Sequence, residues 1–247
     1  MELAKAYIQR NFNRASASYD AVASIQKKCA AQLVDCLKKH FPTFYPDTIL
    51  DLGTGTGYIP EILFDAFPES KFTLNDLSSH MLDKAGKKLR SKSVTYVLGD
   101  MEVQHFDFQD LIISNLALQW VDDLYKTIRK FYEKSSFFAF SCLLDGTFSE
   151  WSKIFIDASL TPPIHRYPSR PALAHYIGSL QPSKYFCNAC AFDLVFSSAA
   201  DFMRYLKALG ANYSHQPVMI SDLKKVINMY TDKIKVTYKV FFCILSR

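Results

Sequence analysis

The sequence lacks two features that would place it in or beyond a membrane. It contains no apolar run of the roughly 18 residues that a membrane-spanning helix needs. Residues 1–14 are polar and charged, whereas a secretory signal needs an apolar stretch near the start. The sequence therefore predicts no membrane span and no signal peptide, and we expect a cytoplasmic protein.

Long blocks of like charge are also missing. The formal net charge is only +5, and the lysine pairs are scattered along the chain. A nucleic-acid-binding surface is usually more concentrated, and no Asn/Asp-Pro-Pro-Tyr-type base pocket occurs. We therefore expect no nucleic-acid partner, whereas a modest positive balance suits an acidic protein partner.

Metal-binding spacing is absent as well. Of six cysteines, only Cys187 and Cys190 form a C-x-x-C pair, and no second pair or H-x-x-x-H motif follows. A structural zinc site needs four ligands, and a redox dithiol usually opens a helix after a strand. Here the pair precedes the strand-like run 191–196. We expect reduced, half-buried thiols and no metal site.

The order of apolar segments predicts an α/β fold. A chain of 247 residues, 49% of them hydrophobic, suits one large domain covering residues 1–247. Strand-like segments alternate with helical ones, which favours right-handed βαβ units and a mostly parallel sheet with helices on both faces. The expected strands are 48–52, 71–75, 94–98, 111–114 and 137–143, and the expected helices are 18–40, 58–67, 78–90 and 121–134.

The regular alternation weakens after residue 144. Residues 145–190 hold five of the ten prolines and no clear strand, so we expect an inserted cap within the single domain. Residues 199–209 form a helical pattern that Gly210 ends. The segment 233–245 alternates and then becomes fully apolar, which suits a hairpin arm that completes a seven-stranded sheet.

The first expected strand runs into a glycine-rich loop. Gly53, Gly55 and Gly57 follow Asp51 in a G-x-G-x-G pattern at the start of a helix. Glycines let the backbone turn and approach a ligand closely, and a helix N-terminus offers free N–H groups. The third glycine of a G-x-G-x-x-G dinucleotide fingerprint would fall on Tyr58. The loop instead resembles motif I of class I S-adenosylmethionine-dependent methyltransferases.

Two further acids follow at the spacing of one βα unit each. Asp76 lies 25 residues after Asp51, and Asp100 lies 24 residues after Asp76. All three therefore fall at the carboxyl edge of neighbouring strands, where open α/β sheets bind ligands. The resemblance implies that Asp76 accepts hydrogen bonds from the ribose hydroxyls, and that Asp100 accepts one from the adenine amino group beside Met101. Asp51 would orient the loop and the amino-acid end of the cofactor. The expected cofactor set is completed by Leu77 and Asn115.

Four narrower motifs cover the chain from about residue 8 to residue 245. They are F-x-R-A-x-x-x-Y at 12–19, D-L-S-x-x-M-L at 76–82, S-N-L-A-x-Q-W at 114–120 and M-R-x-L-K-x-x-G-A at 203–211. Together they resemble the malonyl-acyl-carrier-protein O-methyltransferase family of biotin synthesis. The sequence departs from that family in two places. The turn at 133–136 lacks the usual Lys-Pro-Gly, and residues 145–190 match only loosely.

The resemblance implies methyl transfer from S-adenosylmethionine to the free carboxylate of a malonyl thioester on acyl carrier protein. Such a carboxylate is already ionised at neutral pH, so no general base or catalytic triad is expected. Tyr19, Gln119 and Trp120 would shape the acceptor pocket, and Arg204 or Lys207 would hold the malonyl end. Candidates for a basic surface facing the acidic carrier are Arg166, Arg170, Lys184 and Lys207.

Several alternatives remain open from the sequence. The acceptor could be a small carboxylic acid or a quinone precursor, since the glycine loop and D-L-S-x-x-M-L occur in many methyltransferases. The chain could also be an assembly protein that binds the cofactor without transferring a methyl group. Nucleic-acid methylation has the least support, because no appended basic module is visible.

Overall fold

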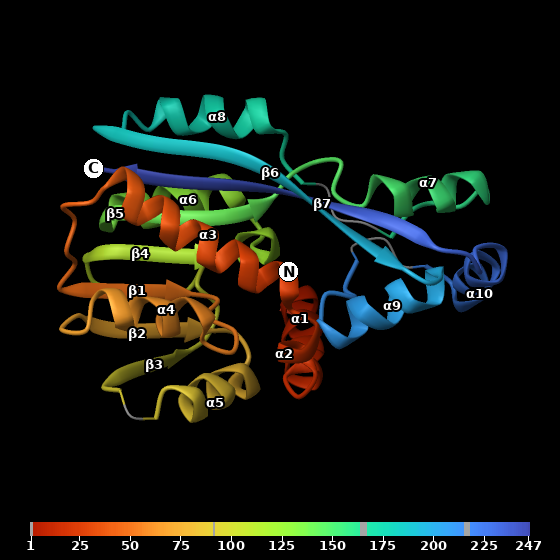
Figure 1. The fold of residues 1–247 in the computed structure, drawn as a ribbon, viewed down its shortest axis with the longest axis horizontal. Helices are drawn as coiled ribbons and strands as arrows, with labels where there is room; N and C mark the ends of the chain where they lie inside the picture. The colour runs from red at the N-terminus through yellow and green to blue at the C-terminus, as the bar shows by residue number, and fades with distance from the viewer. Residues whose placement is uncertain (1, 91, 164–166, 215–217) are drawn as a thin grey trace.

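A computed structural model describes residues 2–90, 92–163, 167–214 and 218–247. Its centre is a seven-stranded sheet in the order β3-β2-β1-β4-β5-β7-β6 (Figure 1). Strands β1 to β5 are parallel, and β7 runs antiparallel to both β5 and β6. The strands are β1 Thr48–Leu52, β2 Lys71–Asp76, β3 Val94–Leu98, β4 Gln109–Asn115, β5 Ser135–Leu143, β6 Lys184–Phe196 and β7 Ile234–Ser246. The predicted α/β, mostly parallel seven-stranded sheet is confirmed.

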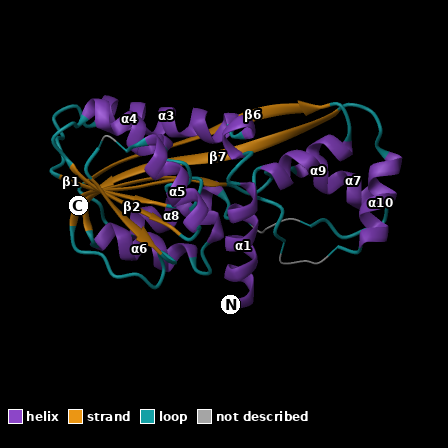
Figure 2. Ribbon diagram, turned by 90° about the horizontal axis from the view of Figure 1, so that it is seen from below, coloured by secondary structure: helices purple, strands orange, loops and turns teal. Residues whose placement is uncertain are grey.

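Helices cover both faces of this sheet, as Figure 2 shows for α3 and α4 on one side and α6 on the other. The helices are α1 Glu2–Ala15, α2 Tyr19–Val22, α3 Ser24–His40, α4 Tyr58–Ala66, α5 Ser79–Lys88, α6 Leu124–Glu133, α7 Ser149–Asp157, α8 Arg170–Ser179, α9 Ala199–Ala208 and α10 Ile220–Met229, with a 3₁₀ turn at Leu118–Trp120. None of the helices in these described ranges has the length and apolar character needed to cross a membrane.

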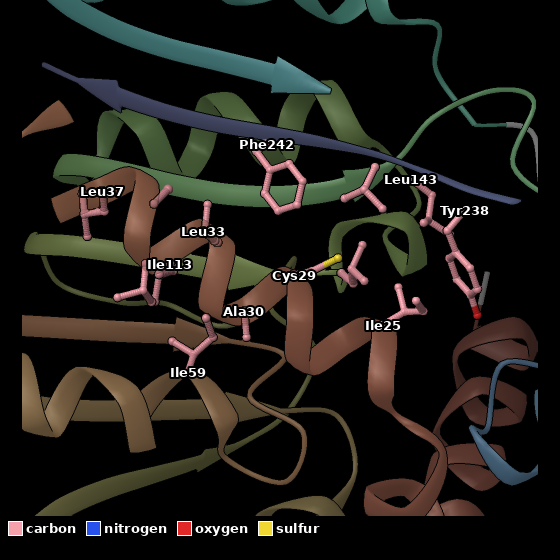
Figure 3. Close-up of a cluster of buried hydrophobic side chains, with 14 of the residues drawn as sticks. Ile25, Cys29, Ala30, Leu33, Leu37, Ile59, Ile113, Leu143, Tyr238 and Phe242 are labelled. Carbon is pink, nitrogen blue, oxygen red and sulfur yellow. The ribbon is translucent and has the colours of Figure 1, made fainter. Parts of the chain in front are cut away.

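The core has two layers because side chains of a strand alternate between faces. On β1, Ile49 joins the cluster under α3 and α4, whereas Leu50 and Leu52 join the cluster under α6 and α8. Figure 3 shows the first cluster, in which Leu33 of α3 lies over the sheet beside Phe242 of β7. Burial on both faces explains why β1 reads as an apolar run rather than an alternating strand.

The N-terminal region differs from the single helix expected over residues 18–40. The helix is interrupted at Ala23, which separates the short α2 from α3. Helix α1 is an additional helix that precedes both of them. Ile8 and Ala15 are the buried apolar side chains of α1. With so few apolar positions, α1 gives a weak periodic signal, and its fold depends on contacts made with distant segments.

Residues 145–190 contain α7, α8 and the first part of β6, which begins at Lys184. The expectation of no strand in this stretch is therefore wrong. Strand β6 is an edge strand with many exposed positions, so it lacks the apolar pattern of a buried strand. Helix α8 packs beside β7 in the second core cluster through Leu173 and Ile177. The role of the stretch as a cap stays a prediction.

The β6–β7 ribbon extends past the end of β5. Leu143, the last residue of β5, pairs with Val240, so residues 234–239 of β7 project beyond β5. Helices α7, α9 and α10 gather around this projecting end, and we call these segments the ribbon lobe (Figure 1). Helix α1 stands between the ribbon lobe and the ends of the parallel strands. A candidate site at these strand ends is therefore enclosed by segments from both chain termini.

Candidate active site

The glycine loop adopts backbone conformations that L side chains rarely adopt. Gly53 has φ +67° and Gly55 has φ +56°. A Cβ on Gly53 would lie 2.4 Å from the Cβ of Ala117, whereas a Cβ on Gly55 would meet nothing within 4 Å. Gly53 is thus required by both conformation and packing, and Gly55 faces open space at the end of β1. This arrangement lets a ligand approach the loop backbone closely.

Asp76 ends β2 and is held by the backbone of two loops. Its carboxylate accepts hydrogen bonds from the N–H groups of Gly55 and Ser78, both at 2.8 Å. Burial raises the pKa of Asp76 to about 6, although these two hydrogen bonds favour the charged form. Ser78 caps α5, because its side chain accepts a hydrogen bond from the N–H of Met81. The carboxylate is therefore fixed in orientation beside the glycine loop.

Both carboxylate oxygens of Asp51 are buried, and the polar neighbour that favours their charged form is the side chain of Thr54. Burial and the nearby charge of Asp76 together raise the pKa of Asp51 to about 7. Buried polar groups are normally paired, and perturbed carboxylates concentrate at functional sites. Asp51 therefore presents a buried carboxylate with a raised pKa under the glycine loop.

A cavity opens at the carboxyl ends of β1, β2, β3 and β4, and we call it the cofactor cavity. Most of the residues expected to bind S-adenosylmethionine line it, namely Gly53, Gly55, Asp76, Leu77, Asp100, Met101 and Asn115. Asp51 and Gly57 are not part of this lining. Gly57 precedes α4, and a Cβ there would lie 3.3 Å from the Cβ of Ala85. These two residues support the wall from behind.

Helix α1 contributes a wall of the cofactor cavity that the sequence did not indicate. Ile8 and Phe12 line the cavity, and Lys5 forms ion pairs with Asp100 at 3.2 Å and Glu102 at 2.6 Å. The side chain of Gln9 donates a hydrogen bond to the carbonyl of Leu77 at 2.8 Å. These partners lie 68 to 97 residues away in sequence, so no local pattern could have identified them.

The S-N-L-A-x-Q-W motif forms a strained turn after β4. Leu116 has φ +48°, and its N–H donates a hydrogen bond to the hydroxyl of Ser141 at 3.0 Å. The side chain of Asn115 donates to the carbonyl of Gln26 at 3.0 Å. Strained backbone persists where the surroundings hold it in place, often at functional sites. This turn directs Trp120 against Phe12, with ring centroids 5.5 Å apart.

A second cavity adjoins the first, and we call it the acceptor chamber. Its polar lining residues are Tyr19, Gln26, Gln119, Tyr167 and Tyr238. Its apolar lining is formed by Phe12, Leu116, Trp120, Leu143, Phe148, Leu209 and Ala211. Phe12, Tyr19, Leu116 and Trp120 line both cavities, so the two are neighbours. The structure thus brings the predicted Tyr19, Gln119 and Trp120 together beside the cofactor cavity.

Three phenols in the chamber come from separate parts of the chain. Burial raises the pKa values of Tyr19, Tyr167 and Tyr238 above that of an exposed tyrosine, so all three are neutral at physiological pH. The hydroxyl of Tyr238 lies 3.0 Å from that of Tyr205 on α9. In Figure 3 the ring of Tyr238 extends beyond Ile25, with its oxygen at the outer end of the cluster. Tyr167 and Tyr238 were not predicted as pocket residues, because no motif surrounds them in the sequence.

The predicted cations lie away from the chamber. Arg204 and Lys207 are exposed on α9, and Arg204 forms an ion pair with Asp201 of the same helix. Neither residue is among the described lining of either cavity. Arg170 is exposed at the start of α8, and Arg166 lies outside the described residues.

Lys184 was expected near the mouth of the pocket, and this expectation is wrong. It pairs in register with Ser246, which pairs with Phe137 near the start of β5. Lys184 therefore lies at the amino edge of the parallel strands, opposite the glycine loop. Its ammonium group donates a hydrogen bond to the carbonyl of His40 at 2.9 Å.

The C-x-x-C pair is not one site. Cys187 and Cys190 both lie on β6, and residues three apart on a strand point to opposite faces. The Sγ atom of Cys187 lies 3.1 Å from that of Cys243, its register partner on β7. Cys190 instead contacts the side-chain amide of Gln32 at 3.0 Å. All six cysteines are free thiols.

Comparisons with known proteins agree with this geometry. A family model described as a methyltransferase domain matches residues 49–134. The malonyl-[acyl-carrier protein] O-methyltransferase of Neorickettsia risticii is 35% identical over 240 residues, covering 97% of this chain and 96% of that protein. The protein of the same name from Priestia megaterium is 30% identical over 264 residues, covering 95% of this chain and 94% of that protein.

Solved structures with the same fold include the YcgJ protein of Bacillus subtilis, with a TM-score of 0.59 and 15% identity over 88% of this chain and 99% of that one. The plantazolicin methyltransferase BpumL, solved in complex with SAH, has a TM-score of 0.57 and 14% identity, covering 100% of this chain and 96% of that one. At this identity the likeness concerns the fold alone. The curated relatives cover nearly the whole chain, and the glycine loop and Asp76 lie within the matched domain. The chain therefore belongs to the malonyl-[acyl-carrier protein] O-methyltransferase family, and it is an S-adenosylmethionine-dependent methyltransferase.

Proposed function

We propose that this enzyme methylates the free carboxylate of a malonyl thioester carried on acyl carrier protein, an early step of biotin synthesis in the cytoplasm. The observation that carries the proposal is the acceptor chamber, which adjoins the cofactor cavity and is closed by family motifs from three parts of the chain. The relatives named for this reaction align over almost the full length, including those parts.

The cofactor is assigned to the residues of the first cavity. Asp76 would accept hydrogen bonds from the ribose hydroxyls, because backbone N–H groups already hold its carboxylate in place. Asp100 and Met101 would bind the adenine, since both line the cavity beyond the end of β3. Asp51 lies behind the cavity wall, so it would orient the amino-acid end of the cofactor through the glycine loop.

The chemistry requires positioning rather than acid–base catalysis. S-adenosylmethionine supplies an electrophilic methyl group on a positively charged sulfur. A carboxylate with a pKa near 4 is already ionised at neutral pH, so the protein has no proton to remove. Its task is to hold the carboxylate in line with the methyl group and to exclude water. The apolar walls of the chamber, including Trp120 and Phe148, serve this exclusion.

The test is an intact-mass measurement on the carrier protein. The purified enzyme is incubated with S-adenosylmethionine and malonyl-acyl carrier protein, and we expect the carrier to gain one methyl group. An acetyl-acyl carrier protein, which lacks the free carboxylate, should gain none. Malonyl-coenzyme A and free malonate, assayed in parallel, separate a carrier-specific enzyme from one that acts on small carboxylic acids.

A matched variant makes the result specific to the proposed site. Asp76→Asn should strongly reduce carrier methylation at a cofactor concentration that just saturates the parent enzyme, whereas Asp83→Asn, on the exposed face of α5, should leave it unchanged. Methylation of free malonate but not of the malonyl carrier would contradict the proposed substrate. An enzyme that binds the cofactor yet methylates none of these acceptors would contradict the proposal as a whole.

A further inference from the structure

The acceptor chamber poses an electrostatic question for an anionic substrate. None of its described lining residues carries a charge, and its polar groups are three phenols and two amides. Moving an ionised carboxylate from water into such surroundings is costly unless it is paired or hydrogen-bonded. The two arginine and lysine candidates on α9 are exposed and do not line it. Another group must therefore offset the cost of moving the ionised carboxylate out of water.

A side-chain cation would stabilise the substrate but would also hinder the reaction. Methyl transfer removes the negative charge of the carboxylate, so an ion pair made before transfer is weakened in the transition state and lost in the product. An interaction that is stronger in the ground state than in the transition state raises the barrier. Neutral donors orient the carboxylate with a smaller loss of this kind, and the positive charge of the cofactor supplies the attraction.

On these grounds we infer that neutral hydroxyl groups of Tyr19 and Tyr238, rather than an arginine or lysine, hold and orient the acceptor carboxylate. The inference rests on the proposed function and extends it to residues that bind the substrate. Tyr19 lines both cavities, which places it at their junction. Tyr238, on β7 near the C-terminus of the sequence, is 3% exposed and also lines the acceptor chamber.

Tyr205 acts as a positioning residue for Tyr238. The two hydroxyls lie 3.0 Å apart, and a hydroxyl both donates and accepts. When Tyr205 donates to Tyr238, the hydroxyl hydrogen of Tyr238 is left for the carboxylate. Gln26 lines the same chamber, and its side-chain oxygen is buried without a hydrogen-bond partner among the described residues. This oxygen can only accept a hydrogen bond, so it cannot bind an ionised carboxylate, and the donors must come from the phenols.

The arrangement also favours product release. After methyl transfer the carboxylate is an uncharged ester and the cofactor has lost its positive charge. Hydrogen bonds to a charged acceptor are stronger than those to a neutral one. The phenols therefore bind the ester more weakly than the acid. A chamber built on a buried arginine would instead leave that cation unpaired once the product forms.

The test separates binding from turnover by using two cofactor analogues. Sinefungin carries an amine near the position of the reacting methyl group, whereas S-adenosylhomocysteine is neutral there. With labelled carrier protein and fluorescence anisotropy, we expect the parent to bind malonyl carrier more tightly with sinefungin than with S-adenosylhomocysteine. Acetyl carrier should show no such difference, because it has no carboxylate.

Variants then assign the effect to residues. Tyr238→Phe and Tyr19→Phe should each weaken malonyl-carrier binding about 10- to 100-fold, as expected for one hydrogen bond to a charged group. The affinity of Tyr238→Phe for S-adenosylmethionine, measured by calorimetry, should equal that of the parent. Tyr205→Phe should show a smaller loss, and Tyr185→Phe, an exposed tyrosine on β6, should match the parent.

Two outcomes would overturn the inference, and a third would overturn the proposed function with it. Parent-like binding by both chamber variants, with loss in Arg204→Gln or Arg166→Gln, would show that a cation holds the carboxylate. Equal binding of malonyl and acetyl carrier by an enzyme that still methylates the malonyl carrier would show that the carboxylate is not bound in the ground state. Absence of malonyl-carrier methylation by the parent would reject the proposed function itself.

Discussion

The two halves of the active site are built in different ways. The cofactor cavity is formed mainly by loops that follow consecutive strands of one sheet, and its key polar groups are carboxylates held by backbone N–H groups. The acceptor chamber draws its lining from segments between residues 12 and 238, and its polar groups are neutral phenols and amides. The first half depends on local sequence and strand order, whereas the second depends on how distant segments meet.

The difference follows from what each half binds. In the proposed assignment, the loops at the sheet edge bind S-adenosylmethionine. The acceptor differs between enzymes, and here α1, the S-N-L-A-x-Q-W turn and the ribbon lobe enclose its chamber. A change in the cofactor half should therefore disturb binding or folding directly. A change in the acceptor half should alter substrate use and leave the cofactor bound.

The largest effect is expected for Gly53→Ala. The substitution forces an L residue into φ +67° and places its Cβ 2.4 Å from that of Ala117. We expect the free energy of unfolding to fall by about 2–4 kcal/mol, from backbone strain and overpacking together. Gly55→Ala is the matched control, because it carries the same strain without the clash and should lose only about 1–2 kcal/mol. Equal losses in urea denaturation would show that packing against Ala117 is unimportant.

The next effect concerns Asp76→Asn. The amide keeps one acceptor oxygen and loses the negative charge, so one of the two loop N–H groups or a ribose hydroxyl is left without its partner. We expect S-adenosylmethionine affinity to fall about 10- to 100-fold in calorimetry. Asp83→Asn, on the exposed face of α5, should bind the cofactor like the parent. A parent-like affinity in Asp76→Asn would contradict the assignment of the cofactor half.

Lowering the pH should reduce S-adenosylmethionine affinity less than the Asp76→Asn substitution does. The pKa of Asp76 is raised to about 6, so the fraction of its charged form falls as the pH is lowered through that value. We expect S-adenosylmethionine affinity to decrease several-fold between pH 7.5 and pH 5.5. Asp76→Asn, already weak, should show a flatter profile over the same range. An unchanged affinity in the parent would mean that the carboxylate is not needed in its charged form.

The raised pKa values also set the sign of a stability effect in the protein without ligand. The folded state holds protons on Asp51 and Asp76 at pH values where the unfolded chain has released them. Their contribution to stability is thus fully present below about pH 4 and is lost as the pH rises through about 6 to 7. Denaturation of the parent and of Asp76→Asn across this window should show the smaller pH dependence in the variant.

The smallest effect is expected for Lys207→Ala in the ribbon lobe. Lys207 is exposed on α9 and does not line the chamber. Its charge can speed the approach of an acidic carrier without contacting the reacting group. We expect kcat/KM for malonyl carrier to fall about two- to threefold at low salt and to match the parent at high salt. A loss that persists at high salt would place Lys207 in direct contact with the substrate.

Several elements of the fold follow from the sequence in detail. The boundaries of β1 and β3 match the expected ones, and the helix expected from residue 78 begins there, with Ser78 as its N-cap. These features depend on short apolar runs and on cap chemistry, which act over a few residues. The start of β6 and the whole of α1 were missed for the opposite reason. An exposed edge strand and a helix with few buried residues depend on partners far along the chain.

Most residues that line the cofactor cavity could be predicted from the sequence alone. A glycine loop after β1 and acids after β2 and β3 must meet at one edge once the strands are parallel, because each βα unit returns the chain to the same side. The acceptor half follows from the sequence only in part, because Tyr167 and Tyr238 join Tyr19, Gln119 and Trp120 through tertiary packing. Tyr19, Tyr167 and Tyr238 come together because α2, the segment before α8 and β7 converge on one chamber. Tyr19 belongs to the F-x-R-A-x-x-x-Y motif, but Tyr167 and Tyr238 leave no periodic or motif signal. Their burial and their place in the shared cavity are consequences of packing.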